Sequence, residues 1–200
     1  MKDLLTAVKL FLALTVLTGV IYPLLVTGIA QVAFRSQAEG SLIMHDGTIV
    51  GSHLIGQAFD DPKYFWSRPS ATTPFPYNAA ASSGSNLGPT NPALVGGKDG
   101  AGKLVTGTLA DRVTSLRAAG SGSAAAVPTD LATSSASGLD PHISPAAADF
   151  QVARVARVRG LSEERVRELV KRHTQDRQFG ILGEPVVNVL ELNLDLDGAR

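Results

Sequence analysis

The sequence predicts a single N-terminal transmembrane α-helix followed by an extracytoplasmic α+β domain. Three observations predict this: a long charge-free apolar run near the N-terminus, later segments with helical spacing and clear caps, and a C-terminal segment in which leucines alternate with polar residues. We therefore divide the chain into a short cytoplasmic N-terminus (1–9), a transmembrane helix (10–34) and an extracytoplasmic α+β domain (35–200).

The apolar run reads "LFLALTVLTGVIYPLLVTGIAQVAF", and no charged residue interrupts it. About twenty apolar residues in a helix cross the hydrocarbon core, so this run is long enough with some tilt. A cleavable signal peptide has a shorter apolar region of about 7–15 residues, and although Ala30 and Ala33 loosely offer a cleavage site, a permanent anchor is the better interpretation. Lys2 and Lys9 precede the run and only Arg35 follows closely, so the positive-inside rule keeps the N-terminus in the cytoplasm and exports the rest.

The surface of this helix carries a stripe of small or kinking residues at four-residue spacing: Thr15, Gly19, Pro23 and Thr27. Small residues let a second helix backbone approach closely in lipid, and the carbonyl freed by a proline is best tolerated against protein or water. The stripe favours a packed partner helix, against the alternative that glycine and proline are simply common in membrane spans.

The exported part is predicted to begin with strands and an ordered loop. Residues 47–59 hold short β-branched runs between glycines, which favours strands or a hairpin. Residues 67–92 are rich in proline, glycine, serine and asparagine, contain aromatic residues and carry one charge, which is typical of an ordered irregular loop rather than a disordered linker. Residues 95–102 and 118–128 are rich in glycine and small residues, and we expect both segments to be flexible.

Three helices and a strand follow. Apolar residues near helical spacing predict a helix over 103–119. Pro145 in a first turn and Gly160 beyond a last turn predict a second helix over 145–159. Ser162 is the predicted N-cap of a third helix. In "VLELNLDLD" (189–197) leucines alternate with polar residues, which predicts a strand with one buried face.

The composition excludes several kinds of binding. The chain has 18 basic and 18 acidic residues and therefore a formal net charge of zero, without the basic excess that nucleic-acid binding normally leaves. It has no cysteine, so disulfides, iron–sulfur clusters and thiolate zinc sites are excluded. The four histidines share no ligand spacing such as HExxH, and no metal site is predicted.

Two stretches carry residue types found in enzymes. "GKDGAGK" (97–103) fits the first seven positions of a phosphate-binding P-loop, but Leu104 stands where a Ser or Thr hydroxyl must hold Mg²⁺, so a loop before a helix is the better interpretation. Ser137, Asp140 and His142 are the residue types of a hydrolase triad, and an anchored periplasmic serine hydrolase using Ser137 and His142 is the alternative function. They lie too close in sequence, around prolines, for the usual triad, so a stiffened loop is favoured and no catalytic residue is assigned.

Seven stretches together resemble one family closely: the KdpC family, which supplies a subunit of the Kdp-type potassium-transporting P-type ATPase of bacteria. They occur in family order and are spread over most of the chain: "TGVIYPLLVTGIAQ" (18–31), "GSHLIGQAF" (51–59), "YFWSRPS" (64–70), "GSNLGPTNP" (84–92), "SGLDPHISPAAA" (137–148), "QVARVARVRGL" (151–161) and "GILGEPVVNVLELNL" (180–194). The glycine-rich "VGGKDGAGK" resembles an insertion relative to the family pattern.

The resemblance implies a non-catalytic accessory subunit in the bacterial inner membrane, single-pass, with ATP hydrolysis in another subunit. The implied partners are a potassium-channel-like subunit and the ATP-hydrolysing P-type subunit of the same complex. On this basis the polar contact candidates are Asn86, Asn91, Asp140 and His142. Trp66 is either an interface anchor or the core's only indole.

The family resemblance also implies a chaperone-like role that raises the ATP affinity of the hydrolysing subunit, and a nucleotide on this subunit. ATP is thus a possible ligand by resemblance alone, and no cofactor follows from the residues themselves. The corresponding positions are Ser135, Ser137, Gly138 and Gln151. The predicted topology conflicts with that nucleotide, because these residues face away from the cytoplasm.

Overall fold

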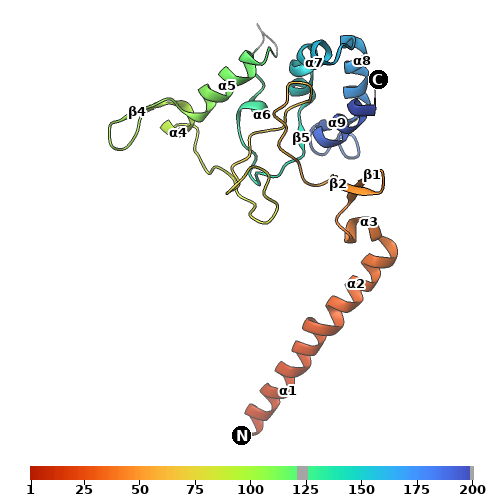
Figure 1. Cartoon of the computed structure of the whole chain (residues 1–200). Coiled ribbons are helices and arrows are strands. Elements are labelled where there is room, and N and C mark those ends of the chain that lie inside the picture. The colour runs from red at the N-terminus through yellow and green to blue at the C-terminus, as the bar shows by residue number, and fades with distance from the viewer. Residues whose placement is uncertain (121–125, 199–200) are drawn as a thin grey trace. The chain divides into compact units, whose positions relative to one another are not determined.

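A computed structural model describes residues 1–120 and 126–198 (Figure 1). The chain divides into two compact units, Met1–Ser52 and a larger unit that begins at His53. The larger unit mixes helices with a small sheet, as the predicted α+β class requires.

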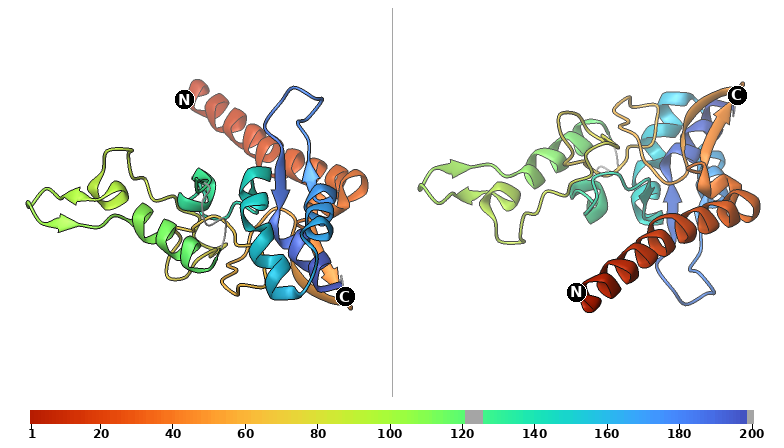
Figure 2. Two further views of the ribbon diagram at one scale, coloured as in Figure 1. Left: turned by 90° about the horizontal axis from the view of Figure 1, so that it is seen from above. Right: turned by 90° about the horizontal axis from the view of Figure 1, so that it is seen from below.

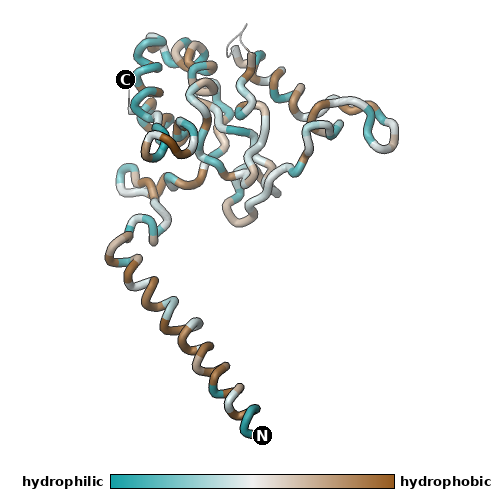
Figure 3. The backbone as a smooth tube through the Cα atoms, turned by 180° about the vertical axis from the view of Figure 1, so that it is seen from behind, coloured by the Kyte–Doolittle hydropathy of each residue, from teal (hydrophilic) through white to brown (hydrophobic). Residues whose placement is uncertain are grey.

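The first unit begins with one long helix in three parts: α1 (Lys2–Val16), a π-helical turn η1 (Leu17–Ile21) and α2 (Tyr22–Ala33). Together they span 32 residues, and the most apolar window has a mean hydropathy of 2.2 with no residue buried. Figure 3 shows this helix as predominantly hydrophobic along its length. By length and composition it can cross a membrane, in agreement with the predicted span.

The π turn lies directly before Pro23 and has a local cause. A proline inside a helix lacks the N–H for the bond to the carbonyl four residues back, and its ring clashes with that carbonyl, here Gly19. A π turn bonds over five residues instead of four, and such turns are a common way to accommodate this disruption. Thr15 and Thr18 donate their hydroxyls to the carbonyls of Phe11 and Leu14, so these polar groups are satisfied within the helix.

The first unit ends with a short helix α3 (Arg35–Ala38) and a β-hairpin of β1 (Leu42–His45) and β2 (Thr48–Ser52). The turn is Asp46-Gly47, with φ of 49° and 74°, the left-handed values that a tight hairpin turn uses. The prediction of strands in 47–59 was therefore partly wrong. The hairpin lies earlier because Asp-Gly is its turn, and the chain after Ser52 leaves the sheet.

The larger unit is built from short strands and helices packed around α7, the longest helix of this unit among the residues that the structure describes. In chain order its elements are α4 (Pro92–Val95), β3 (Gly97–Lys98), β4 (Leu104–Val105), α5 (Thr108–Ala118), α6 (Thr129–Ala132), β5 (His142–Ile143), α7 (Pro145–Arg159), α8 (Glu163–Arg172), β6 (Thr174–Gln175), β7 (Val186–Asn188) and α9 (Val189–Gly198). Strand β7 lies between β5 and β6, antiparallel to both, with Val187 opposite both Ile143 and Thr174.

Helices α7 and α8 are confirmed, together with their caps. The Ser144 hydroxyl accepts the N–H of Ala147 at 3.0 Å, and Gly160 ends α7 in the left-handed conformation with φ of 68°. The Ser162 hydroxyl accepts the N–H of Arg165 at 3.2 Å and so caps α8, as predicted.

The predicted strand over 189–197 was wrong, because this segment is helix α9. Val189, Leu192 and Leu196 are buried, and their spacing of three and four residues places them on one helical face. The side-chain oxygen of Asn188 accepts the N–H of Glu191 at 3.2 Å, which is the geometry of an N-cap. Alternating leucines satisfied both periodicities, and the cap selected the helix.

The helix predicted over 103–119 is shorter than expected, since α5 begins at Thr108. Residues 104–105 instead pair with 97–98 as a two-stranded hairpin, so the glycine-rich stretch is a hairpin and not a P-loop leading from a strand into a helix. No helix or strand forms between Ser67 and Asn91, as predicted for an ordered irregular loop. Part of the expected flexible connection 118–128 lies outside the described residues, at 121–125.

The core of the larger unit surrounds α7. Val152 and Val155 are fully buried and belong to one cluster with residues from α8, α9, α5 and α6, among them Leu169, Leu192, Leu116 and Leu131. Phe65 and Trp66 join the same cluster from the irregular part of the chain, so the loop that carries the motif "YFWSRPS" is packed into the core.

Candidate functional site

Two buried amide side chains hold the extended segment 65–66 against the helices. Asn193 of α9 accepts the N–H of Phe65 at 2.8 Å and donates to its carbonyl at 2.9 Å. Gln151 of α7 does the same for Trp66, at 2.8 Å and 3.2 Å. Both amides are almost fully buried. Because a buried backbone must have its polar groups paired, these side chains take the place of a neighbouring β-strand.

A buried arginine completes this arrangement. Arg154 of α7 is fully buried, donates to the carbonyls of Pro62 and Tyr64, and donates at 2.7 Å to the same Gln151 oxygen that receives the Trp66 N–H. Its guanidinium lies 4.5 Å from the Trp66 ring centre. Burial, aided by the nearby charges of Arg157 and Arg112, lowers the pKa of Arg154 to about 10, so it stays charged at neutral pH.

Trp66 is consequently a core residue, with 8% of its surface exposed. Its indole N–H donates to the carbonyl of Asp61 at 3.1 Å, and Arg112 lies 5.6 Å from the ring, in addition to Arg154. Of the two roles left open by the sequence, the structure supports the core indole. The indole itself therefore presents little surface for any further contact.

The loop of residues 67–70 meets the loop of residues 135–142 through a polar cluster of Arg68, Asp140 and His142. Arg68 donates to one carboxylate oxygen of Asp140 at 3.1 Å. The other carboxylate oxygen accepts the backbone N–H of His142 at 3.0 Å and lies 3.5 Å from the ring nitrogen Nδ1 of the same residue. Burial raises the pKa of Asp140, but the hydrogen bonds from His142 and the charge of Arg68 together outweigh it, and the net pKa lies below the ordinary value.

Two motif glycines let these loops approach one another closely. A Cβ on Gly56 would lie 2.6 Å from the Tyr77 ring and 2.9 Å from the carbonyl oxygen of Asp140. A Cβ on Gly138, whose φ is 69°, would lie 2.5 Å from the carbonyl oxygen of Ser83. Neither position accepts a side chain without movement, so the glycines of the motifs "GSHLIGQAF" and "SGLDPHISPAAA" lie where backbones touch.

Tyr77 lies at the centre of these loops. Its hydroxyl donates to the carbonyl of Arg68 at 2.8 Å, and its N–H donates to the Ser70 hydroxyl at 2.9 Å. Burial raises the pKa of Tyr77 to about 12, so the phenol keeps its proton and remains a hydrogen-bond donor.

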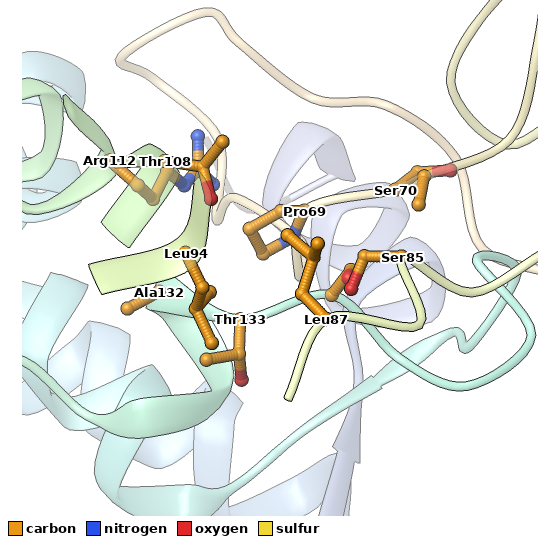
Figure 4. Close-up of a pocket in the computed structure, with 11 residues that line it drawn as sticks. Pro69, Ser70, Ser85, Leu87, Leu94, Thr108, Arg112, Ala132 and Thr133 are labelled. Atoms are coloured by element: carbon orange, nitrogen blue, oxygen red, sulfur yellow. The ribbon is translucent and has the colours of Figure 1, made fainter. Parts of the chain in front are cut away.

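The loops enclose two surface hollows. One, of about 640 Å³, is broad and shallow, and it is lined by Leu54, Ile55, Arg68 and residues of the 135–142 loop, including Asp140 and His142. The other, of about 380 Å³, lies among Pro69, Leu87, Leu94, Thr108 and Arg112 (Figure 4). Arg112 donates there to the carbonyls of Leu131 and Ser67, so its guanidinium joins α5 to the motif loop.

Asn86 and Asn91, the remaining polar contact candidates, lie on the loop that borders the second hollow. Asn86 is exposed and has a φ of 53°, a left-handed conformation that asparagine tolerates better than most residues. The Asn91 oxygen accepts the N–H of Ala93 at 2.9 Å and caps α4. Asn86 is therefore the more available of the two for a further hydrogen bond.

Ser137 and His142 are not arranged as a nucleophile and its base. The Ser137 hydroxyl accepts the N–H of Leu139 at 3.1 Å, and His142 is held by Asp140. Both side chains lie in the described part of the chain, and no hydrogen bond joins Ser137 to His142 there. The group therefore lacks the base–nucleophile contact on which triad chemistry depends.

The positions that the family resemblance assigns to a nucleotide already have structural partners. The Ser135 hydroxyl accepts the N–H of Gly138 at 2.9 Å, and Gly138 is packed against Ser83. Gln151 is fully buried, and its amide is occupied by Trp66, Ala147 and Arg154. A nucleotide reaching Gln151 has to displace the hydrogen bonds that hold segment 65–66.

The network of Gln151, Arg154 and Asn193 was missed by sequence reasoning. A polar signal was available, because Gln151 stands between Phe150 and Val152, and Asn193 between Leu192 and Leu194. Amides at otherwise apolar positions indicate buried hydrogen-bond partners, although the sequence does not say which.

An apolar helix long enough to span a membrane precedes a small α+β domain whose motif loops are held together by their own polar side chains. This arrangement is consistent with the class of membrane-anchored proteins. The comparison with known proteins identifies the family. The profile described as "KdpC: K+-transporting ATPase, c chain" matches residues 4–198, and the chain belongs to this family.

Curated relatives agree along the whole chain. A "Potassium-transporting ATPase KdpC subunit" of Sorangium cellulosum is 61% identical over 194 residues, which cover 97% of this chain and 96% of the relative. Proteins with the same description from Polaromonas naphthalenivorans and Methylococcus capsulatus are 60% and 58% identical, covering 100% and 97% of this chain and 97% and 96% of the relatives. The resemblance drawn from the seven motifs is thereby confirmed.

Proposed function

We propose that this protein is the non-catalytic accessory subunit of an ATP-driven potassium uptake complex, anchored in the bacterial inner membrane with its α+β domain outside the cytoplasm. The observation that carries the proposal is the full-length match to a family described as the c chain of a potassium-transporting ATPase. The motif loops support it, because their polar side chains bind one another and the backbone instead of converging on a substrate.

In this proposal the partners are a potassium-channel-like subunit and the ATP-hydrolysing P-type subunit. The exported domain lies over the potassium entrance of the channel-like subunit, with the loops that carry Asn86, Asp140 and His142 in contact. The anchor helix packs on partner helices along the stripe of Thr15, Gly19, Pro23 and Thr27. A π turn within that stripe supports this, because the backbone groups it leaves are best satisfied against protein.

The proposal includes a chaperone-like effect on the ATP affinity of the hydrolysing subunit. With the α+β domain outside the membrane, this effect has to pass through the anchor helix or the channel-like subunit, since direct contact with cytoplasmic ATP is excluded by that topology. The full chain alone should then bind no ATP, and substituting Ser137 or Gln151 should change the ATP requirement of the complex only through folding or assembly.

Deletion and copurification experiments test the proposal. Cells that lack this chain should lose complex-dependent potassium uptake at low external potassium, and a tagged copy of the chain should copurify with two larger membrane proteins. Normal uptake in the deletion strain would refute the proposed role.

The membrane topology can be tested by cysteine labelling, because the chain contains no cysteine of its own that would react with the label. A single cysteine at the exposed Thr114 of α5 should react in intact cells with a maleimide that cannot cross the inner membrane. A cysteine replacing the exposed Asp3 should react only after the membrane is opened. The reverse pattern would place the α+β domain in the cytoplasm and overturn the proposal.

A further inference from the structure

The loop between β6 and β7, residues 176–185, presents three large apolar side chains to solvent. Phe179 is 91% exposed, Ile181 74% and Leu182 55%. Figure 2 shows the loop projecting from the ends of the two strands. Single exposed apolar residues are ordinary on protein surfaces, but three within four positions at the end of one projection form a patch that calls for a partner. We name Phe179, Ile181 and Leu182 the apolar tip.

The loop is ordered by its own contacts. The N–H of Gln178 donates to the carbonyl of Leu182 at 2.9 Å, and the reciprocal bond is also 2.9 Å. An ion pair between Arg177 and Glu184, at 2.5 Å, joins the two sides of the loop. These contacts hold the apolar tip in one arrangement before any partner arrives, which reduces the entropy cost of binding.

The backbone conformation of Phe179 also favours a partner for this loop. Its φ is 54°, in the left-handed region that a bulky residue rarely adopts. A phenylalanine here adds nothing to the core, since it is almost fully exposed, and it strains the backbone where a glycine would not. The ring contributes almost no buried area to the fold, which favours a role in binding.

The charge of the loop indicates what covers the tip. Among residues 176–185, Asp176 and Glu184 are acidic and Arg177 is the one base, so the net charge is −1. A tip made for an anionic lipid surface is normally flanked by lysine or arginine, which add attraction to the apolar insertion. This loop lacks that flank, and a recess in a protein suits it better.

We propose that the apolar tip inserts into an apolar recess on the extracytoplasmic face of the channel-like subunit, and that this contact fixes the position of the α+β domain in the complex. This inference rests on the proposed function. Phe179 is the central contact, because it is the largest and most exposed of the three side chains.

The test is a competition for assembly that uses Phe179→Gly. Glycine adopts a φ of 54° freely, so this variant removes the aromatic ring while leaving the fold as stable as before or more stable. The wild-type and variant full-length chains are co-expressed at equal levels, the complex is purified through a tag on the channel-like subunit, and the two forms are counted by mass spectrometry. Burying one phenylalanine contributes enough to predict about a 10- to 100-fold exclusion of the variant.

Leu104→Ser provides the matched control. Leu104 is 76% exposed on the β3–β4 hairpin of the same unit, so the substitution removes a similar exposed apolar side chain elsewhere. It should be incorporated equally with the wild type. Equal incorporation of Phe179→Gly would overturn the inference, as would equal exclusion of Leu104→Ser, which would mean that any exposed apolar side chain matters.

A photo-crosslinking residue at position 179 of the full-length chain identifies the neighbour. Cross-links to the channel-like subunit support the inference, whereas cross-links only to lipid or to a second copy of this chain overturn it. If the wild-type chain itself fails to copurify with the other subunits, the proposed function fails as well. If it copurifies and Phe179→Gly competes equally, the docking contact alone fails.

Discussion

Replacing Gln151 by methionine tests whether the buried amide network holds the motif loop in place. Methionine has a similar size, so the change removes hydrogen bonds without opening a large cavity. It leaves the N–H and the carbonyl of Trp66 without their Gln151 partners and removes one acceptor from Arg154. Gln151, Trp66 and Arg154 are all buried.

The cost follows from the groups that lose their partners. Each buried polar group left unpaired costs about 1–3 kcal/mol, and more for a charged donor, so Gln151→Met should lower the free energy of unfolding by about 4 kcal/mol. For a domain of this size each kcal/mol lowers the melting temperature by about 2–4 °C, which predicts a decrease of about 8–16 °C.

The single tryptophan makes the measurement direct. Trp66 is the only indole in the chain and is itself a member of the network, so its fluorescence in the full-length protein reports the unfolding of this region. Ala153→Ser is the matched control, because Ala153 is exposed on the same helix, and its melting temperature should stay near that of the wild type.

A melting temperature of Gln151→Met within about 2 °C of the wild type would refute this reasoning, since that shift corresponds to no more than about 1 kcal/mol. The same variant separates two explanations of any loss of ATP response in the complex. A loss that accompanies lower stability reflects unfolding of the loop, whereas a loss at unchanged stability would indicate that Gln151 contacts the nucleotide directly.

Three further substitutions give separate tests. Gly138→Ala should cost about 1–3 kcal/mol because of the positive φ and the 2.5 Å approach to Ser83, and an unchanged urea midpoint would contradict that close contact. Asp140→Asn keeps the turn but removes the charge. Because the pKa of Asp140 is lower in the folded protein than in the unfolded chain, the ionised carboxylate stabilises the fold above the unfolded pKa of about 3.9. This stabilisation disappears as the pH falls through the folded pKa. The stability difference between wild type and Asp140→Asn, measured by urea unfolding across pH, should therefore shrink below about pH 4, and a constant difference down to pH 3 would count against it. Asn188→Ala removes the cap of α9 and should lower stability by about 1–2 kcal/mol, and a urea midpoint that does not move, followed by circular dichroism, would show that the cap contributes nothing.

The elements predicted correctly from the sequence are those whose signals lie within a few neighbouring residues. Helices α7 and α8 were predicted correctly because Ser144, Gly160 and Ser162 cap them within one turn of the helix itself. The apolar run likewise identifies the candidate membrane helix without reference to the rest of the chain. In each case a few neighbouring residues determine the structure.

Helix α9 shows where periodicity alone fails. Leucines at every second position match a strand, but the same segment also contains a buried helical face made of Val189, Leu192 and Leu196. The overlooked signal was Asn188 followed by Glu191, the spacing of an N-cap and its third helical residue. Asn188 and Glu191 together favour the helix where the leucine spacing alone favours a strand.

The candidate site depends on contacts that no local pattern contains. Gln151 meets Trp66 across 85 positions of sequence, and Asn193 meets Phe65 across 128. The sequence does supply the ingredients, since both amides interrupt apolar runs, but their pairing follows from the packing of α7 and α9 on one core. The apolar tip was missed for a related reason, because exposure is a property of the folded chain.

The π turn at Leu17–Ile21 also makes the long N-terminal helix respond differently to a deletion at different positions. A π turn is equivalent to an α-helix with one inserted residue, so removing a single residue there lets the helix return to regular winding while the two flanking halves keep their mutual orientation. Removing a residue from a regular stretch instead rotates everything beyond it by about 100°. This helix therefore has, at Leu17–Ile21, a position where a chain one residue shorter keeps the same two faces aligned.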